Sequence, residues 1–317
     1  TVKNLYENLD RVANPRLRRK LAEHRDSAEL AARLVRLRRD APVSLDLAMC
    51  RVDGPDLEKL NRLYAALGFE SLMRERAPAG QEALLRGPQP KQELDTIASV
   101  PKDYSVVSSP EAVAELARTL AAQEVIAFDL ETTSLQPREA RIVGLAFSWK
   151  AGQGAYVPTA GPPGSELCAV ETALRLLRPV LEKEAPRKVG QNLKYDMAVL
   201  KNYGVELAGL YCDTMVASYL LYPSERSHGL DALAARHLGY RPVKIDELIG
   251  KRGSQVTMDR VDVGKVAPYA CEDADVAFQL AGTLSARLRE EGLWELFERL
   301  EMPLVPVLAE MEWGGVK

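Results

Sequence analysis

The chain has 317 residues, 46% of them hydrophobic, so it can form about two domains with sizeable cores. Its formal net charge of −3 argues against a general coat for duplex DNA, which would be strongly basic, but not against an enzyme with local nucleic-acid contacts. No apolar run approaches the ~20 residues of a membrane span and no basic-then-apolar leader is present, so we expect neither a membrane protein nor a secreted one.

The cysteines also argue against a secreted protein. The four cysteines are scattered and lack the spacing of a metal-binding pair: Cys50, Cys168, Cys212 and Cys271. This pattern is typical of reduced thiols and predicts a cytoplasmic protein.

Residues 1–76 are expected to be mostly helical, because helix start signals recur near Asn14, Asp26 and Gly54. Basic side chains dominate between residues 11 and 39: Arg11, Arg16, Arg18, Arg19, Lys20, Arg25, Arg33, Arg36, Arg38 and Arg39. Two interpretations stay open: the segment contacts the backbone of a DNA duplex, or it is an ordinary solvated helical face.

Proline and glycine interrupt residues 77–103, which predicts an interdomain linker. Strand and helix patterns follow. The expected strands cover residues 125–130, 141–149, 154–158, 188–191 and 210–213, and the expected helices cover residues 109–122, 166–182, the segment around Asp196, and 266–288. This order predicts an α/β fold, with a mixed sheet flanked by helices after a small, mostly helical domain.

The first acidic motif is Asp129-x-Glu131, in the apolar strand pattern that begins at residue 125. Side chains alternate across a strand, so both acids are expected on one face. Two acids on a buried strand are costly unless a cation neutralises them, and Mg²⁺ prefers oxygen ligands. An acid-x-acid pattern is also common by chance in a chain with 45 acidic residues.

The second motif lies at a strand-to-helix junction. Asn192 is expected to cap the helix that carries Asp196 one turn later. Asp196 is either a site residue or an acid favoured by the positive end of the helix dipole.

The third motif is Tyr269-x-x-x-Asp273, within a helical apolar pattern. Residues four apart share a helix face, so Tyr269 and Asp273 are expected on the apolar stripe, whereas Glu272 and Asp275 are expected to be solvated. Taken alone, Tyr269 could be a core tyrosine, Asp273 a salt-bridged acid, and Cys271 an ordinary buried thiol.

Taken in this order, the three motifs resemble the 3′-5′ exonuclease family with four acids and a tyrosine. They are most similar to the proofreading domain of bacterial DNA polymerase I (family A), which residues 128–132, 191–196 and 269–276 match almost residue for residue. The resemblance implies a ribonuclease-H-like fold.

The flanking segments extend the resemblance. Residues 5–10, 40–43 and 69–72 are similar to the C-terminal helices of the family's 5′ nuclease domain, and residues 301–308 and 314–317 to the entry of its polymerase domain. The implied parts are a helical 5′ nuclease remnant (1–80), a linker (81–103), a 3′-5′ exonuclease domain (104–297) and the start of a polymerase domain (298–317). We therefore expect neither nucleotide incorporation nor 5′ nuclease activity from this chain.

The resemblance also implies roles for the motif residues. Asp129, Glu131, Asp196 and Asp273 would be the ligands of two divalent metal ions, Mg²⁺ or Mn²⁺. Tyr269 would orient the attacking water, because an unperturbed tyrosine pKa of about 10 makes a poor general base.

Further residues are expected at the substrate. By resemblance, Leu135 wedges against the terminal bases, while Gln191, Asn192 and Tyr195 contact the last nucleotides. Ile245 stands where the family often has an aromatic residue, so stacking on a base would be weaker. Ordinary core packing is the alternative for Leu135 and Ile245.

Three functions are compared. The favoured one is a proofreading 3′-5′ exonuclease that acts on single-stranded or frayed DNA 3′ ends, beside the polymerase domain of the same full-length chain, in the bacterial cytoplasm at the nucleoid. A non-catalytic module that supports the polymerase domain is the second, although all four acids and Tyr269 are present. An RNA-trimming exonuclease is the third, although both flanks favour DNA.

Overall fold

The computed structural model describes residues 1–37, 40, 42, 56–67, 69, 94–251, 253 and 255–315. Two compact units divide the chain, Thr1–Gly87 and Pro88–Lys317. Several sequence expectations fall outside the described residues: Arg38, Arg39, the start signal at Gly54, Cys50, most of the motifs at 40–43 and 69–72, the linker up to residue 93, and the last two residues.

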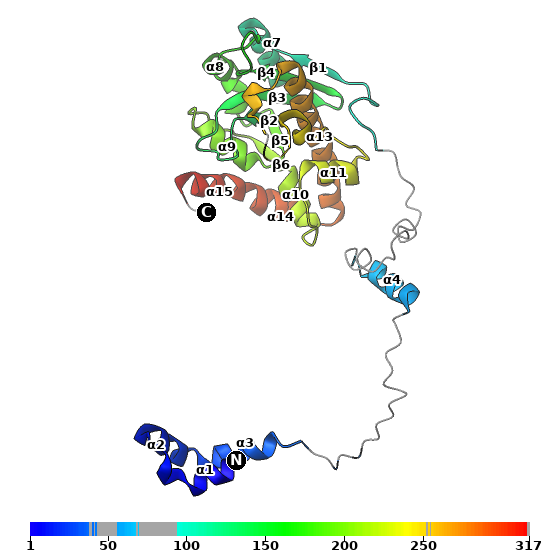
Figure 1. Ribbon diagram of the computed structural model, residues 1–317. Coiled ribbons are helices and arrows are strands. Elements are labelled where there is room, and N and C mark those ends of the chain that lie inside the picture. The colour runs from blue at the N-terminus through cyan, green and yellow to red at the C-terminus, as the bar shows by residue number, and fades with distance from the viewer. Residues whose placement is uncertain are drawn as a thin grey trace. The chain divides into compact units, whose positions relative to one another are not determined.

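The described part of the first unit is mostly helical, as expected (Figure 1). Its elements are α1 (Val2–Glu7), the short 3₁₀ turn η1 (Leu9–Arg11), α2 (Pro15–Glu23), α3 (Arg25–Leu34) and α4 (Leu57–Ala66). Asn14 caps α2 by accepting hydrogen bonds from the amides of Arg16 and Leu17, with Pro15 in the first turn. The buried Tyr6 donates a hydrogen bond to the Leu21 carbonyl, which ties α1 to α2.

The second unit is built on one six-stranded sheet with the order β1-β4-β3-β2-β5-β6. The strands are β1 (Asp103–Val106), β2 (Val125–Thr132), β3 (Ile142–Lys150), β4 (Gln153–Pro158), β5 (Arg187–Gly190) and β6 (Leu210–Asp213). Strands β2, β3 and β4 pair antiparallel, while β1, β5 and β6 join in parallel. The predicted mixed sheet is confirmed.

Helices cover both faces of this sheet. The side chains of β2 alternate between the two faces, so the strand contributes to a hydrophobic core on each side. Phe128 and Leu130 pack with α7 (Pro110–Ala121), α8 (Val170–Leu181) and α9 (Leu193–Lys201) on one face. Ala127 packs with the long helix α13 (Val263–Glu290) on the other. Figure 1 shows α7 and α8 on one side of the sheet and α13 on the other.

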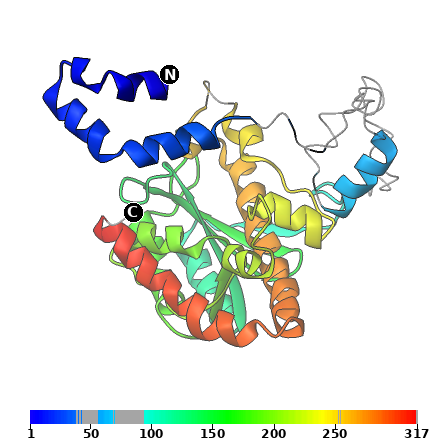
Figure 2. The same ribbon diagram turned by 90° about the horizontal axis from the view of Figure 1, so that it is seen from below.

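Shorter elements complete the unit. They are α10 (Thr214–Leu221), α11 (Leu230–His237), α12 (Ile245–Ile249), the 3₁₀ turn η2 (Met258–Arg260), α14 (Trp294–Leu296), the π-helical turn η3 (Phe297–Glu301) and α15 (Met302–Gly314). Figure 2 shows α15 running beside α9, with which it is in contact. Among the described residues, no helix combines the length and apolarity needed to cross a bilayer.

The structure changes two expected boundaries. Helix α8 begins at Val170 rather than at residue 166, because the Cys168 amide donates to the Pro158 carbonyl and keeps that segment extended. The end of the expected linker is docked rather than free. The Asp95 amide donates to the Gly239 carbonyl, and the Arg241 amide donates to the Asp95 carbonyl.

The prediction that Glu272 and Asp275 are solvated is wrong, because both are fully buried. Asp275 accepts hydrogen bonds from Lys102 Nζ (2.8 Å), Tyr104 Oη (2.8 Å), the Gly152 amide (3.0 Å) and Gln279 Nε2 (2.8 Å). Glu272 accepts from Tyr240 Oη (2.5 Å) and the Val243 amide (2.7 Å). A buried carboxylate is tolerated once it is hydrogen-bonded, and most of these partners are distant in sequence.

Candidate active site

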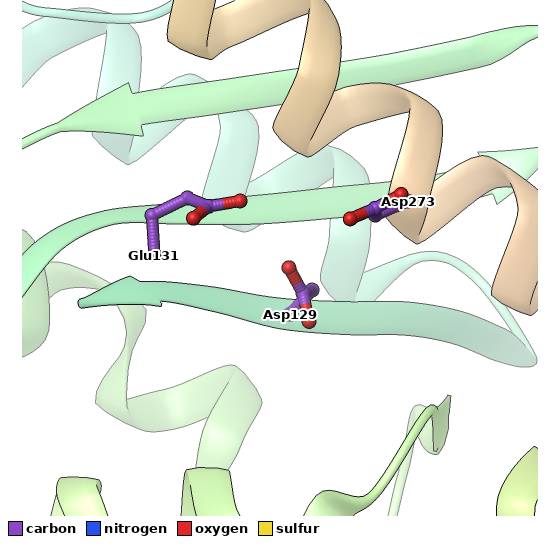
Figure 3. Close-up of side chains that lie close together, drawn as sticks. All are labelled: Asp129, Glu131 and Asp273. Carbon is purple, nitrogen blue, oxygen red and sulfur yellow. The ribbon is translucent and has the colours of Figure 1, made fainter. Parts of the chain in front are cut away.

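Strand β2 presents two carboxylates to the α13 face of the sheet. Asp129 and Glu131 alternate with Phe128 and Leu130, which are buried in the opposite core. Asp273 comes from α13, and carboxylate oxygens of the three residues all lie within 4.8 Å of one another. Figure 3 shows the three side chains directed toward a common point. The predicted convergence of these acids is therefore present.

Helix α13 approaches the sheet closely because its inner face carries small side chains. Ala267, Ala270, Cys271 and Ala274 are all buried there. Asp262 caps the helix by accepting a hydrogen bond from the Gly264 amide. Cys271 is a free buried thiol whose pKa is raised to about 12, mainly by burial, which agrees with the ordinary-thiol interpretation.

Asp196 faces the same carboxylates from the first turn of α9. It is buried, and the charges of Asp129, Asp213 and Glu131, after burial itself, raise its pKa well above the ordinary value. It lies outside the group of three whose oxygens fall within 4.8 Å. The structure thus brings all four acids into one neighbourhood, with Asp196 as its outer member.

The expected capping of α9 by Asn192 is wrong. Asn192 occupies the N-cap position with a left-handed backbone (φ 60°) and its side chain makes no capping hydrogen bond. Asp213, at the end of β6, caps instead. Its carboxylate accepts from the amides of Asn192 (3.1 Å) and Leu193 (2.8 Å), and also from those of Met215 and Val216 in α10. The Asp213-Thr214 pair at a strand end is a sequence signal for the cap of α10, but not for that of α9.

Burial and mutual repulsion dominate the electrostatics of the acids. Burial raises the pKa of Asp129 to about 7, partly offset by the Leu130 backbone amide. The pKa values of Glu131 and Asp273 are raised well above their ordinary range, first by burial and then by neighbouring carboxylates. Among the described residues, no Lys or Arg nitrogen lies within ion-pair distance of any of the four acids.

Such a cluster fits divalent cations. Its donors are carboxylate oxygens, which Mg²⁺ and Mn²⁺ prefer, and the negative charge has no protein counter-ion in the part of the chain that the structure describes. Bound cations would remove the repulsion that raises these pKa values.

Tyr269 lies one helical turn before Asp273. Burial, followed by the charges of Asp273 and Glu131, raises the pKa of its hydroxyl far above the ordinary value. A protonated hydroxyl at this place can orient a water molecule, and even the ordinary tyrosine pKa of about 10 makes a poor general base near neutral pH.

The residues expected at the substrate differ in their exposure and in whether their polar groups already have hydrogen-bond partners. Leu135 is 89% exposed and Ile245 is 43% exposed, so neither is an ordinary core residue. The Gln191 side chain is already occupied, since its Oε1 accepts from Thr214 Oγ1 (2.5 Å) and its Nε2 donates to the His228 carbonyl (2.9 Å).

Tyr195 is also engaged. Its hydroxyl lies 2.5 Å from both Thr132 Oγ1 and the Ser134 carbonyl, at the turn that precedes Leu135. Tyr195 therefore links α9 to the end of β2, and any contact with a nucleotide would use its ring.

Comparison with known proteins identifies the family of the chain. A family model described as 3′-5′ exonuclease matches residues 104–289. DNA polymerase I of Pseudomonas aeruginosa is 35% identical over 98% of this chain and 35% of the relative, and that of Rhizobium leguminosarum is 30% identical over 98% of this chain and 38% of the relative. The chain thus spans about a third of the length of these relatives.

Solved structures show the same fold. Brucella melitensis NrnC bound to pGG has a TM-score of 0.53 at 20% identity over 68% of this chain and 95% of NrnC, and a second NrnC structure, with bound Mg²⁺, has a TM-score of 0.52 at 19% identity over 68% of this chain and 95% of that one. A Pol1 structure from M. smegmatis, described as complexed with DNA primer-template and dNTP, has a TM-score of 0.52 at 24% identity over 66% of this chain and 31% of its own.

The expected ribonuclease-H-like architecture is confirmed by these neighbours, and the sequence matches are extensive. The chain belongs to the bacterial DNA polymerase I family and carries its 3′-5′ exonuclease domain.

Proposed function

We propose that this chain is a metal-dependent 3′-5′ exonuclease that removes deoxynucleoside 5′-monophosphates from the 3′ end of DNA. The observation that carries the proposal is the convergence of Asp129, Glu131 and Asp273 within 4.8 Å. Within a full-length polymerase chain, this activity would proofread newly made DNA in the bacterial cytoplasm, at the nucleoid.

Four carboxylates would hold two divalent ions, Mg²⁺ or Mn²⁺. Asp129 would help to hold both ions, Glu131 and Asp273 would help to hold the ion that binds the attacking water, and Asp196 would help to hold the other ion. When bound, such ions lower the pKa of a water and stabilise the leaving 3′ oxygen. The Mg²⁺-bound NrnC structure of the same fold supports this choice of metal.

Tyr269 would position the attacking water together with Glu131. Because an ordinary tyrosine pKa of about 10 already makes a poor general base, the hydroxyl would hold the water in line with the scissile phosphodiester without removing its proton. The proton would leave to solvent.

The exposed Leu135 and Ile245 would contact the terminal bases of a single strand, and Gln191, Asn192 and Tyr195 would shape the path of the last nucleotides. Single-strand binding of this kind relies on base contacts and a local backbone groove rather than on base-edge recognition. A mismatched terminus frays more readily than a paired one, so it would reach the carboxylates more often.

The flanking segments are assigned by family resemblance. We propose that residues 1–80 are the C-terminal part of a 5′ nuclease domain, 81–103 a linker, 104–297 the exonuclease domain and 298–317 the start of a polymerase domain. The polymerase domain of the same full-length chain would then be the partner that passes frayed ends to this site.

Digestion of labelled oligonucleotides tests the proposal. With Mg²⁺, a single-stranded DNA carrying a 5′ label should shorten stepwise from its 3′ end, and the reaction should stop in EDTA. A duplex with a 3′ mismatch should be trimmed faster than a matched duplex, and RNA of the same sequence should be cut more slowly than DNA. Intact DNA in the presence of Mg²⁺ and Mn²⁺ would instead favour a non-catalytic module, and preferential cutting of RNA would favour an RNA-trimming enzyme.

A further inference from the structure

A buried tyrosine on β4 adjoins the carboxylates, although the mechanism above assigns it no role. Tyr156 is 1% exposed, and its hydroxyl is buried without a hydrogen-bond partner among the described residues. Buried polar groups are nearly always hydrogen-bonded, so an unpartnered hydroxyl beside a candidate active site requires an explanation.

The pairing of the strands directs this ring toward Glu131. Strand β3 lies between β4 and β2, with Tyr156 paired to Ala146 and Glu131 paired to Gly144. On the shared face, Gly144 therefore separates Tyr156 from Glu131. A methyl group added to Gly144 would lie 2.2 Å from both Cζ and Oη of Tyr156, so the phenol ring covers the glycine.

Glycine at position 144 thus provides the space in which the hydroxyl extends toward β2. Any side chain there would have to displace the ring, which is fixed in the core by its burial. The two residues are complementary in shape, because the missing side chain of Gly144 leaves room for the phenol of Tyr156 on the neighbouring strand.

The strand pairing identifies the neighbour of the hydroxyl. The end of the phenol lies over Gly144, and Gly144 is paired with Glu131 on the next strand. A protonated phenol beside a carboxylate can serve as a hydrogen-bond donor to it.

We propose that Tyr156 is a positioning residue of the metal site, whose hydroxyl donates a hydrogen bond to Glu131 when divalent ions are bound. The inference rests on the proposed function. A ligating carboxylate needs one oxygen directed at the ion, and a donor on its other side fixes that orientation. Tyr156 would hold Glu131 in its metal-binding rotamer, and Gly144 would keep the space between them open.

The Tyr156→Phe variant tests this idea without DNA. In the metal-free protein the hydroxyl has no partner among the described residues, so its removal should leave the unfolding temperature equal to that of the wild type or higher. The affinity for Mn²⁺, measured by isothermal titration, should fall about 10–100-fold, as is typical when a supporting partner of a metal ligand is lost. Single-turnover cleavage of single-stranded DNA should slow to a similar extent.

A matched control is Tyr104→Phe, another tyrosine whose hydroxyl faces a carboxylate. The Tyr104 hydroxyl donates a hydrogen bond of 2.8 Å to Asp275, which belongs to no proposed metal site. This variant should show the opposite pattern, with a lower unfolding temperature and an unchanged Mn²⁺ affinity.

Three results would overturn the assignment. Wild-type Mn²⁺ affinity in Tyr156→Phe would exclude a positioning role, whatever the cleavage rate. A lower metal-free unfolding temperature with unchanged affinity would make Tyr156 purely structural. A wild-type protein that binds no Mn²⁺ would refute the proposed metal site as well, so failure of the proposed function is distinguishable from failure of this inference alone.

Discussion

At the scale of single residues, the fold places the acids of this site where their charged forms are poorly solvated. Burial raises the pKa of Asp129 to about 7, and the same cause acts on Glu131 and Asp273. A carboxyl group whose pKa is higher in the folded than in the unfolded state binds more protons when folded. Its stabilising contribution is therefore present at low pH and is lost as the pH rises through the folded pKa.

The metal-free protein should accordingly lose stability between about pH 4 and pH 7 through Asp129, and the raised pKa values of Glu131 and Asp273 act in the same direction. Asp129→Asn removes one half-buried charge, so we expect the metal-free variant at pH 8 to be more stable than the wild type by about 1–3 kcal/mol. Urea unfolding in EDTA at pH 5 and pH 8 measures this, and the gain should be smaller at pH 5. A variant that is less stable than the wild type at pH 8 would contradict it.

The same carboxylate should be indispensable for cleavage. Asp129→Ala should keep the fold and reduce the rate by more than the ~100-fold typical of residues that only support a metal ligand. Circular dichroism and single-turnover digestion with Mg²⁺ measure the two effects. Asp246→Ala, at an exposed carboxylate in α12, is a suitable control and should cleave at the wild-type rate. Wild-type activity in Asp129→Ala would show that the ligand assignment is wrong.

At the scale of elements, Asp213 joins β6, α9 and α10 through one carboxylate. It accepts hydrogen bonds from amides at the starts of both helices, and α9 carries Asp196. Each buried amide left without an acceptor costs about 1–3 kcal/mol. We therefore expect Asp213→Ala to lower the free energy of unfolding by about 2–4 kcal/mol and to weaken Mn²⁺ binding, because Asp196 would lose its fixed position.

Ser109→Ala provides the comparison, since Ser109 caps α7 in an exposed position by accepting from the Ala112 amide. Its loss should cost about 0.5–1 kcal/mol and leave Mn²⁺ affinity unchanged. Chemical denaturation with calorimetric titration separates the two variants. Equal stability losses, or unchanged metal binding in Asp213→Ala, would argue against a role for this cap in placing Asp196.

The elements themselves were largely predictable from the sequence. Alternation placed Asp129 and Glu131 on one face of β2, and helical spacing placed Tyr269 and Asp273 on one stripe of α13. Local patterns could not reveal that Asp213, rather than Asn192, caps α9, because the capping group comes from a strand 20 residues away. The sequence could not reveal that the Tyr156 hydroxyl lacks a hydrogen-bond partner in the described part of the chain, because its surroundings depend on the order of the strands.

At the scale of the second unit, residues far apart in sequence are joined through buried acids. Lys102 and Asp275 are 173 residues apart, and their ion pair is almost fully buried. Helical spacing predicted that Asp275 would face solvent. Periodicity shows which residues share a helix face, but it cannot show that Lys102, from a segment far away in the sequence, covers and neutralises one of them. This pair attaches the start of the exonuclease fold to the middle of α13.

Removing one partner of such a pair leaves a buried charge uncompensated, which costs about 3–5 kcal/mol. For Lys102→Met we expect a loss near the lower end of that range, because Tyr104, Gln279 and the Gly152 amide still donate to Asp275. Cleavage per folded molecule should stay at the wild-type level, since neither partner belongs to the proposed metal site. Arg118→Met, which breaks the exposed pair with Glu115, should change stability by less than about 1 kcal/mol. Equilibrium denaturation of both variants decides the matter, because equal effects would mean that burial adds nothing to the Lys102 pair.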